Sequence, residues 1–414
     1  MRRTIKIGAS AASLALLLAA CSSGDDTTTT TDTASSAAPT ASSGTFTIWA
    51  DETRTPPIKE QCDIFAEANG ITCDVVQIDI GDIRTRVVQG SQTGDVPDVF
   101  IGAHDWLGEL VTNGVVAPVD LGGNSASFSE VAVKAATYDG KTYGVPYAVE
   151  NLAMLTNPEL SPECPASLDD LQAAGKKLKD DGDASLPLAV QMGDQGDAYH
   201  WYPLYSADGG YIFGAGGTDV ADMGVGKEGS IKAAERLQAM ADEGLLKASV
   251  TSDIAIESYT GGKSAWWITG PWNAGTALEN VPDTKVCPVP NGDSTSTPFI
   301  GVQTFFIPTK APNALIAQTF LNDYVMTTEF MDAMYAADPR PPAWTESAAK
   351  ITDPITQGFI EFGLQGIPQP SVPEMGSVWE ALGLAQFKVA SGEDPTTTMT
   401  EAGDAITKSI AAQG

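Results

Sequence analysis

Two kinds of hydrophobic spacing follow one another where the folded part of the chain begins. Residues 45–49 alternate between apolar and polar side chains, as a half-buried strand does, and residues 74–78 also read as a strand. Between them, Pro56-Pro57 introduces a helix that ends at Gly70. One face of that helix carries Ile58, Cys62, Phe65 and Ala66.

The pattern continues through a second helix and a third strand. Gly81-Asp82 would cap the helix, which runs to Gly90-Ser91, and a strand is expected over residues 98–101. The order strand, helix, strand, helix, strand predicts an α/β protein with a parallel sheet. Ligands of such sheets bind at the carboxyl ends of the strands. Those ends are the turns Asp51–Arg54, Asp79–Asp82 and Gly102–Trp106.

Later segments show the same two kinds of spacing. The helices expected from it are Leu168–Lys179, Ile231–Glu243, Ala314–Thr327 and Ala381–Ala390. The strands expected from it are Lys141–Val149, Ala265–Ile268 and Phe305–Pro308. No internal repeat stands out.

Residues 1–20 are expected to be an export signal, with Cys21 as the first residue of the mature, lipid-anchored tether (residues 21–44). Arg2, Arg3 and Lys6 precede a short apolar run, and Leu18-Ala19-Ala20-Cys21 is a small-residue cleavage site that ends in cysteine. The tetrad resembles a bacterial lipobox, which implies that Cys21 is lipidated and anchors the chain to the outer face of a cytoplasmic membrane. An ordinary secretory signal with an incidental cysteine is the alternative.

Composition separates a tether from a globular body. Residues 22–44 are almost all Ser, Thr, Ala, Gly and Asp, too polar to offset the entropy of ordering them. The roughly 370 residues that follow suffice for two lobes with separate cores. The net charge of −30 argues against nucleic-acid and anionic-lipid partners and favours a neutral solute.

Four cysteines remain after Cys21, an even number in an exported chain, which favours two disulfides over a metal site. Cys62–Cys73 would close a short loop between a helix and the next strand, leaving Cys164–Cys287 by elimination. Four cysteines allow three connectivities, so the pairing stays open at this stage.

Aromatic and hydrogen-bonding residues occur close together in several places, as a sugar site requires. Sugars offer flat C–H faces for stacking and rings of hydroxyls for hydrogen bonds. Such pairs are Trp49 with Asp51 and Arg54, Asp105 with Trp106, Asp197 with Tyr199 and His200-Trp201-Tyr202, and Trp272 with Asn273.

A colinear set of segments resembles the maltose/maltodextrin-binding proteins of ABC importers. The segments are Ile48-Trp49, Gly94–Asp98, Ala103–Asp105, Asn113-Gly114, Tyr138–Lys141, Pro146–Glu150, Ala207–Tyr211, Thr269–Trp272, Lys285–Pro290, Pro298–Val302, Pro373–Met375 and Trp379. The resemblance implies a bilobal, periplasmic-binding-protein-like fold with a hinge and a central cleft. We expect one lobe from residues 45–149 and 300–345 and the other from residues 150–299 and 346–414.

The resemblance also implies sugar-binding roles for particular residues. Asp105 and Glu150 match acidic sugar ligands, and Asp197, Tyr199, Trp272 and Trp379 match an acidic residue, a stacking tyrosine and two stacking tryptophans of the second lobe. Each has a structural alternative: a helix N-cap for Asp105, a buried salt bridge for Glu150 and a core position for the tryptophans. At least one of Trp266 and Trp267 should be core.

Departures from the family pattern affect the identity of the sugar. Gly102 and Trp106 stand where a tryptophan and an arginine are usual, so the aromatic platform has moved. Thr53-Arg54 replaces an Asp-Lys pair, with Asp51 two residues earlier, and Gly383 replaces an arginine. Asp51, Arg54 and Trp106 remain candidate ligand residues.

The expected function is a non-catalytic, monomeric binding lipoprotein that delivers α-linked gluco-oligosaccharides to an ABC permease. It needs no cofactor or metal. Trehalose, α-galactosides and pentose oligomers are alternative ligands. An anchored glycosidase using Asp105 and Glu150 is a second hypothesis, but no nucleophile elbow, metal cluster or phosphate loop supports an enzyme. A surface adhesin is a third.

Overall fold

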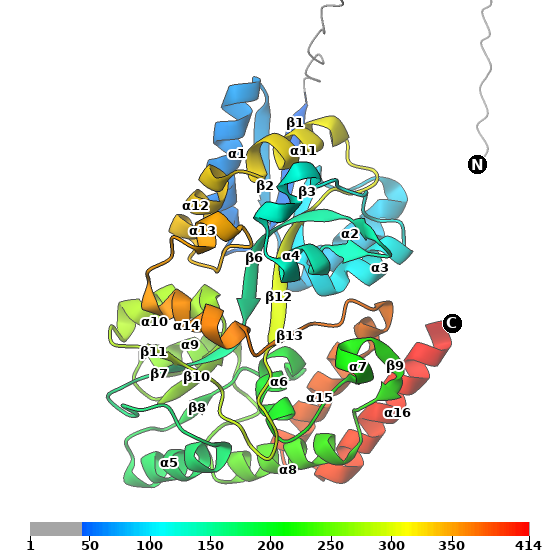
Figure 1. Cartoon of the computed structure of the whole chain (residues 1–414). Helices are drawn as coiled ribbons and strands as arrows, with labels where there is room; N and C mark the ends of the chain where they lie inside the picture. The colour runs from blue at the N-terminus through cyan, green and yellow to red at the C-terminus, as the bar shows by residue number, and fades with distance from the viewer. Residues whose placement is uncertain (1–43, 414) are drawn as a thin grey trace, which may run out of the picture. The chain divides into compact units, whose positions relative to one another are not determined.

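The structure is a computed structural model that describes residues 44–413 (Figure 1). The predicted signal segment, Cys21 and the tether up to residue 43 lie outside the described residues. The described part is built on two main sheets, each covered on both faces by helices.

The first sheet has six strands in the order β13-β12-β3-β1-β2, with β6 also paired to β12. Its strands are β1 (Thr45–Ala50), β2 (Thr72–Gln77), β3 (Val99–Ala103), β6 (Gly144–Asn151), β12 (Phe299–Phe306) and β13 (Ile367–Pro368). β1 runs parallel to both β2 and β3, so the predicted parallel unit is confirmed. β12 runs antiparallel to β3 and β6.

Helices cover the two faces of this sheet with separate cores. On one face, Phe46 and Ile48 pack with Phe65 of α1 (Thr55–Asn69) and with Phe330 of α12 (Thr328–Ala337). On the other, Phe100 packs with α2 (Ile80–Thr93) and α3 (Leu107–Thr112). The alternation of side chains along each strand produces this division.

The second sheet has four strands in the order β11-β7-β10-β8. They are β7 (Ala153–Thr156), β8 (Leu188–Ala189), β10 (Trp266–Thr269) and β11 (Lys285–Cys287). Trp266 packs in the core on one face and Trp267 in the core on the other, so both are core residues. β7 follows β6 after a single residue, which carries the chain directly from the first sheet to the second.

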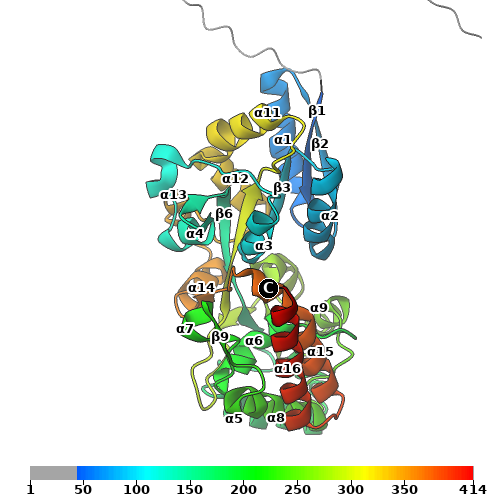
Figure 2. The same cartoon turned by 90° about the vertical axis from the view of Figure 1, so that its right-hand side faces the viewer.

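Further helices surround the sheets, and α8, α15 and α16 pack against one another (Figure 2). The remaining helices are α4 (Glu130–Ala135), α5 (Leu168–Asp181), α6 (Ala198–Ala207), α7 (Gly214–Gly217), α8 (Glu228–Asp242), α9 (Ser252–Thr260), α10 (Ala274–Asn280), α11 (Ala314–Thr319), α13 (Thr345–Ala348), α14 (Pro354–Gly363), α15 (Trp379–Ala390) and α16 (Pro395–Gln413). The short strands β4 (Thr137–Tyr138) and β5 (Lys141–Thr142) form a hairpin, and β9 (Asp219–Met223) lies apart from the main sheets.

Some predicted boundaries were wrong. The strand expected at Phe305–Pro308 is the end of β12, which begins six residues earlier. The strand expected over Lys141–Val149 is divided between β5 and β6. The helix expected over Ala314–Thr327 changes after Thr319 into a π-helical stretch.

Helix ends follow ordinary capping chemistry. Gly70 ends α1, as predicted, and adopts a left-handed conformation with φ 66°, which glycine tolerates because it has no Cβ to clash there. The predicted cap of α2 was wrong: Asp79, rather than Gly81-Asp82, accepts the free N–H of Gly81 at 2.9 Å. An Asp one residue before the helix is the standard acceptor for such an N–H.

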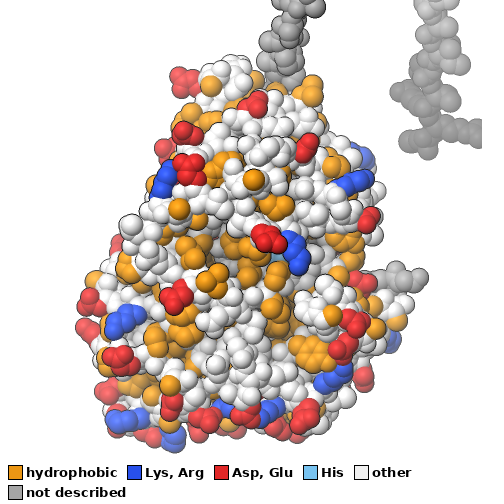
Figure 3. Space-filling view, in the orientation of Figure 1, with side chains coloured by type: hydrophobic (Ala, Val, Ile, Leu, Met, Phe, Trp, Pro, Cys, Tyr) orange, Lys and Arg blue, Asp and Glu red, His pale blue; other side chains and the backbone are white. Residues whose placement is uncertain are grey.

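Among residues 44–413, none of the helices is long and apolar enough to cross a membrane. The face drawn in Figure 3 carries scattered Asp and Glu side chains around hydrophobic ones, as the charge of −30 leads one to expect.

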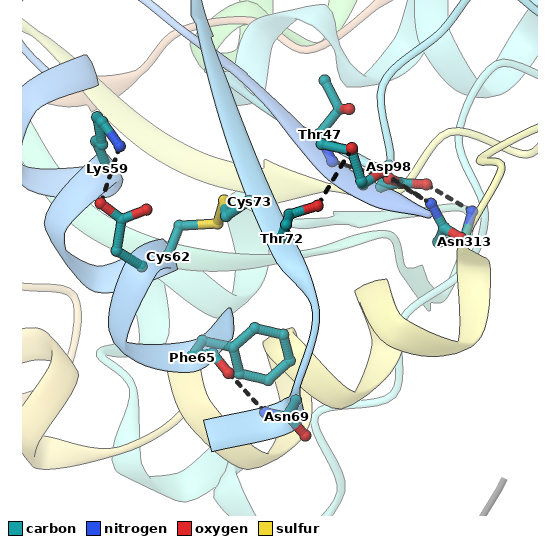
Figure 4. The surroundings of a disulfide bond; sticks show 11 residues. Thr47, Lys59, Cys62, Phe65, Asn69, Thr72, Cys73, Asp98 and Asn313 are labelled. Atoms are coloured by element: carbon teal, nitrogen blue, oxygen red, sulfur yellow. Dashed lines mark hydrogen bonds and ion pairs between the residues drawn. A yellow bond between two sulfur atoms is a disulfide. The ribbon is translucent and has the colours of Figure 1, made fainter. Parts of the chain in front are cut away.

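Both predicted disulfides form. Cys62 of α1 and Cys73 of β2 point toward one another across the helix–strand contact (Figure 4). Cys164, in the segment after β7, bonds Cys287 at the end of β11. Each bond therefore joins segments that pack around one sheet.

Removing the disulfides should cost unequal stability. The sequence separations are 11 and 123 residues, and in the chain-entropy model those loops correspond to about 3 and about 5 kcal/mol. The pair Cys164→Ser, Cys287→Ser should therefore lower the free energy of unfolding in guanidinium more than the pair Cys62→Ser, Cys73→Ser. Equal losses, or the reverse order, would contradict the entropic account.

Candidate ligand-binding site

Glu150 is the centre of a buried polar network beside the crossing between the sheets. It lies near the end of β6 with 2% of its surface exposed. Oε1 accepts from Arg340 Nη1, and Oε2 accepts from Gln303 Nε2 at 3.0 Å. Arg54 Nη2 lies 3.9 Å from Oε2. Its buried charge is thus balanced by two guanidinium groups and an amide.

Asp51 and Arg54 extend this network from the turn after β1. Asp51 Oδ1 accepts from the N–H groups of Thr53 and Arg54 at 3.1 and 3.0 Å, and Oδ2 pairs with Arg54 Nη1. Arg54 Nε donates to the Tyr147 hydroxyl at 2.6 Å. Both predicted ligand residues therefore hold the turn and support Glu150 in this conformation.

Arg340 belongs to the network although it was not among the predicted site residues. Besides Glu150, it pairs through Nε with Asp338 and donates through Nη2 to Thr53 Oγ1. Burial alone would lower the pKa of Arg340, but Glu150, Tyr147 and Asp338 raise it well above its ordinary value. One signal was available: a single charged residue set among three prolines at Pro339, Pro341 and Pro342.

His104 joins the turn after β3 to two other segments. Its Nδ1 accepts from the Val302 N–H at 3.1 Å, so Nε2 carries the proton and donates to the Gln369 carbonyl at 3.2 Å. Burial lowers the pKa of His104 to about 4. The ring is therefore neutral at physiological pH.

Asp105 is buried at the same turn and faces the helix α15. Burial raises its pKa to about 6, against opposing effects of Arg84 and of a side-chain hydrogen bond from Trp379. Trp379 is the first residue of α15, whose apolar face packs in the core of the second sheet. The alternative role as cap of the following helix is wrong, because α3 has no side-chain cap.

Trp106 fills the space above Gly102. A Cβ placed on Gly102 would lie 2.3 Å from the Trp106 ring, so the two positions are complementary. The indole of Trp106 thus occupies the space over residue 102. It is 7% exposed and packs with Ile78, Phe100 and Leu107 in this conformation.

Rings from several elements of the second sheet side gather opposite the acidic network. Trp272, in the turn after β10, is half-buried, and its ring lies over Gly270, where a Cβ would be 2.0 Å away. Its ring centroid is 6.4 Å from that of Tyr199. Phe299 links the group, with centroids 6.5 Å from Tyr199 and 6.0 Å from Trp379. Phe299 was not predicted as a site residue, although it lies in a segment that carries the family resemblance.

Asp197 precedes α6 and uses its carboxylate within the protein. Oδ1 accepts from the His200 N–H at 2.9 Å as the helix cap. Oδ2 accepts from His200 Nδ1 at 2.9 Å and from Gln191 Nε2 at 2.7 Å.

Carboxylates from both sides of the site act electrostatically on Tyr199. Burial, then the charges of Glu150, Asp197 and Asp105, raise the pKa of Tyr199 well above its ordinary value. The Tyr199 hydroxyl also lies 3.8 Å from the position a Cβ would take on Gly301. Tyr199 therefore lies within electrostatic range of Asp105 and Glu150, and Trp379 contacts Asp105. A groove of about 510 Å³ between α15 and α16 is lined by none of the predicted residues.

The sequence profile of the bacterial extracellular solute-binding protein family matches residues 60–358. The chain belongs to this family. That membership agrees with the bilobal α/β fold and with a non-enzymatic role, because the family is named for binding solutes.

Several relatives of this solute-binding protein have names that state a ligand. It is 27% identical to the maltodextrin-binding protein MdxE of Bacillus subtilis, over 89% of this chain and 90% of the relative. It is 27% identical to the maltooligosaccharide ABC transporter solute-binding lipoprotein of Streptococcus pneumoniae, over 87% of each chain. It is 26% identical to the galactooligosaccharide-binding protein of Bacillus subtilis, over 90% of this chain and 91% of the relative.

Adjacent residues of the site should titrate with opposite effects on stability. Asp105 has a pKa of about 6 in the folded protein, against an ordinary 3.8, so its carboxyl binds a proton more readily when folded. It therefore does not lower the free energy of unfolding below pH 4, and lowers it fully above pH 6. His104, with a pKa near 4 against 6.5, costs stability only as pH falls from 6.5 to 4. Each residue lowers the free energy of unfolding by about 3 kcal/mol, one at high pH and the other at low pH. Their pH dependences therefore largely cancel in this solute-binding protein.

Asp105→Asn should reveal the pH dependence of stability that His104 alone produces. In urea denaturation the variant should be more stable than wild type by up to about 3 kcal/mol at pH 7.5, and the two should converge near pH 4. The variant's stability should fall with acidity because only His104 then titrates. A difference that grows toward low pH would contradict this assignment.

Arg340→Met should leave Glu150 with an unbalanced buried charge. We expect a loss of about 3 kcal/mol or more in the free energy of unfolding. Glu150→Gln combined with Arg340→Met should recover much of it, since the remaining amide carries no charge. A double variant as unstable as the sum of both single ones would show that the pair is not coupled.

Proposed function

We propose that this solute-binding protein is the substrate-binding lipoprotein of an ABC sugar importer. It binds maltose- and maltodextrin-type α-gluco-oligosaccharides and delivers them to permease subunits in the membrane. Family membership and the names of two relatives support the class of function.

The observation that carries the proposal is the meeting of carboxylates and aromatic rings at one site. Asp105 and Glu150 lie on the first sheet side, and Tyr199, Trp272 and Trp379 lie on the second. Rings stack on the C–H faces of a pyranose while the acids accept hydrogen bonds from its hydroxyls. Asp51, Arg54 and Trp106 would then act mainly by shaping that wall, since the protein already engages each of them.

The binding cycle would consist of opening and closing about the crossing between the sheets. The contacts of His104 with Gln369 and of Asp105 with Trp379 join the two sides in the present conformation. A ligand stabilises the closed form by its higher affinity for that form, and the permease would recognise closure.

We assign the lobes to residues 45–149 with 300–345 and to residues 150–299 with 346–414. The two sheets support this division, with one refinement: β13, at residues 367–368, pairs with β12 in the first sheet. The segment around β13 would therefore be part of the hinge.

We further propose that Cys21 is lipidated and holds the protein, as a monomer, at the outer face of the cytoplasmic membrane. The lipobox resemblance and the relative named a lipoprotein support this anchor. Residues 22–44 would let the body reach its permease.

A galacto-oligosaccharide is the second candidate ligand. The galactooligosaccharide-binding relative is 26% identical over 90% of this chain, and the maltodextrin-binding relative is 27% identical over 89%. The two matches are therefore nearly equal. Galactosides offer the same C–H faces with a different hydroxyl arrangement, so the same rings would serve.

Intrinsic tryptophan fluorescence of the mature domain tests the proposal. Titration with maltose, maltotriose and longer maltodextrins should give a saturable change, because rings at the site would contact the ligand, and trehalose and galacto-oligosaccharides are titrated alongside. A change with galacto-oligosaccharides alone would favour the second candidate. No binding to any of these sugars by a folded protein would overturn the proposed function.

Trp272→Ala should weaken maltotriose binding by ten- to a hundredfold with little change in melting temperature, because the side chain is half-buried. Trp267→Phe is the matched control: that tryptophan is 1% exposed in the core, so the variant should lose stability and keep its affinity. The opposite pattern would make Trp272 a core residue.

A further inference from the structure

His200 is a buried polar residue among the rings of the candidate site. It lies in the first turn of α6 with 6% of its surface exposed. Its ring centroid is 5.3 Å from that of Tyr199 and 6.0 Å from that of Trp272, with interplanar angles of 84° and 83°. The imidazole is therefore set nearly perpendicular to both proposed stacking residues.

One nitrogen of this ring is paired and the other is not. Nδ1 lies 2.9 Å from Asp197 Oδ2, and because a carboxylate only accepts, Nδ1 carries the proton. Nε2 is buried and has no hydrogen-bond partner. A buried polar atom left unpaired costs stability, so such an atom in a native protein calls for an explanation.

Asp197 holds the ring in place rather than offering a free acid to a ligand. Its carboxylate receives three hydrogen bonds, from the His200 N–H, His200 Nδ1 and Gln191 Nε2, and its own N–H donates to Gln386 Oε1 at 2.7 Å. Burial would raise the pKa of Asp197, but His200 and Gln191 outweigh it and lower the pKa. The ionised carboxylate thus fixes both the tautomer and the direction of Nε2.

We infer that His200 is a ligand-contacting residue whose Nε2 hydrogen-bonds a hydroxyl of the sugar stacked on Trp272. The inference rests on the proposed function. A pyranose that lies flat on an indole directs its hydroxyls outward along the ring edge, and the angle of 83° between the imidazole and the Trp272 ring suits a hydrogen bond to that edge. Asp197, which the family resemblance makes a sugar ligand, becomes the positioning residue for His200 in this chain.

His200→Phe tests the inference because it keeps an aromatic ring and removes the unpaired nitrogen. The dissociation constant for maltotriose should rise at least tenfold, the loss expected for one buried hydrogen bond. The melting temperature should change little, since the lost bond from Nδ1 to Asp197 Oδ2 is offset by the removal of the unpaired Nε2. His200→Gln, which returns a polar group, should recover part of the affinity.

Tyr205→Phe is the matched control on the same helix. Tyr205 is fully buried, and its hydroxyl donates to the Tyr211 carbonyl at 3.1 Å within the protein. This variant should show the reverse pattern, with a lower melting temperature and unchanged affinity for maltotriose.

The outcomes separate the inference from the proposed function. Wild type that binds maltotriose while His200→Phe binds it equally well overturns the role of His200 and leaves the sugar-binding function intact. The role of His200 is overturned in the same way if His200→Phe loses stability as Tyr205→Phe does without losing affinity. Wild type that binds neither α-glucans nor galacto-oligosaccharides overturns the proposed function and, with it, this inference.

Discussion

The buried ion network around Glu150 is the interaction on which the arrangement of the site depends. It draws together the turn after β1, the end of β6, the middle of β12 and the proline-rich segment at Arg340. Burying these charges is expensive unless each is paired. The ion pairs and hydrogen bonds of the network hold the Glu150 carboxylate at the crossing between the sheets.

A second buried charge that lowers stability lies at the neighbouring turn, where Asp105 is close to Trp379. A carboxyl whose pKa rises to about 6 is a destabilising choice for a structural residue at neutral pH. Such a cost is typical of groups retained for binding, because a ligand hydroxyl can supply the hydrogen bond that water no longer does. The neutral His104 beside it keeps the turn in place without adding a second charge.

The sequence predicted local structure well because local rules determine it. Alternation, helical spacing and the left-handed Gly70 were enough for the first five elements. β12 was seen only in part: Gly301, Gln303 and Thr304 interrupt its apolar run, yet all eight residues are buried. Burial on both faces removes the alternation that marks a strand.

The site was only partly predictable because its partners are distant in the chain. Arg340 contacts Glu150 across 190 residues, and no spacing rule joins them. His200 stood beside Asp197 and Tyr199 in the sequence, but its unpaired nitrogen is visible only once the surrounding rings are placed. The resemblance to sugar-binding relatives suggested the acids and rings as candidates, and the fold revealed which polar groups hold them.

The disulfides have a consequence for the mechanics of the molecule. Cys62–Cys73 closes within the first sheet and its helix, and Cys164–Cys287 closes around the second sheet, so neither covalent bond spans the crossing. Each sheet is thus cross-linked to its own surroundings, while the chain running from β6 into β7 and noncovalent contacts join the two. An oxidising environment can therefore stabilise this protein against unfolding without a covalent restraint on the opening and closing proposed above.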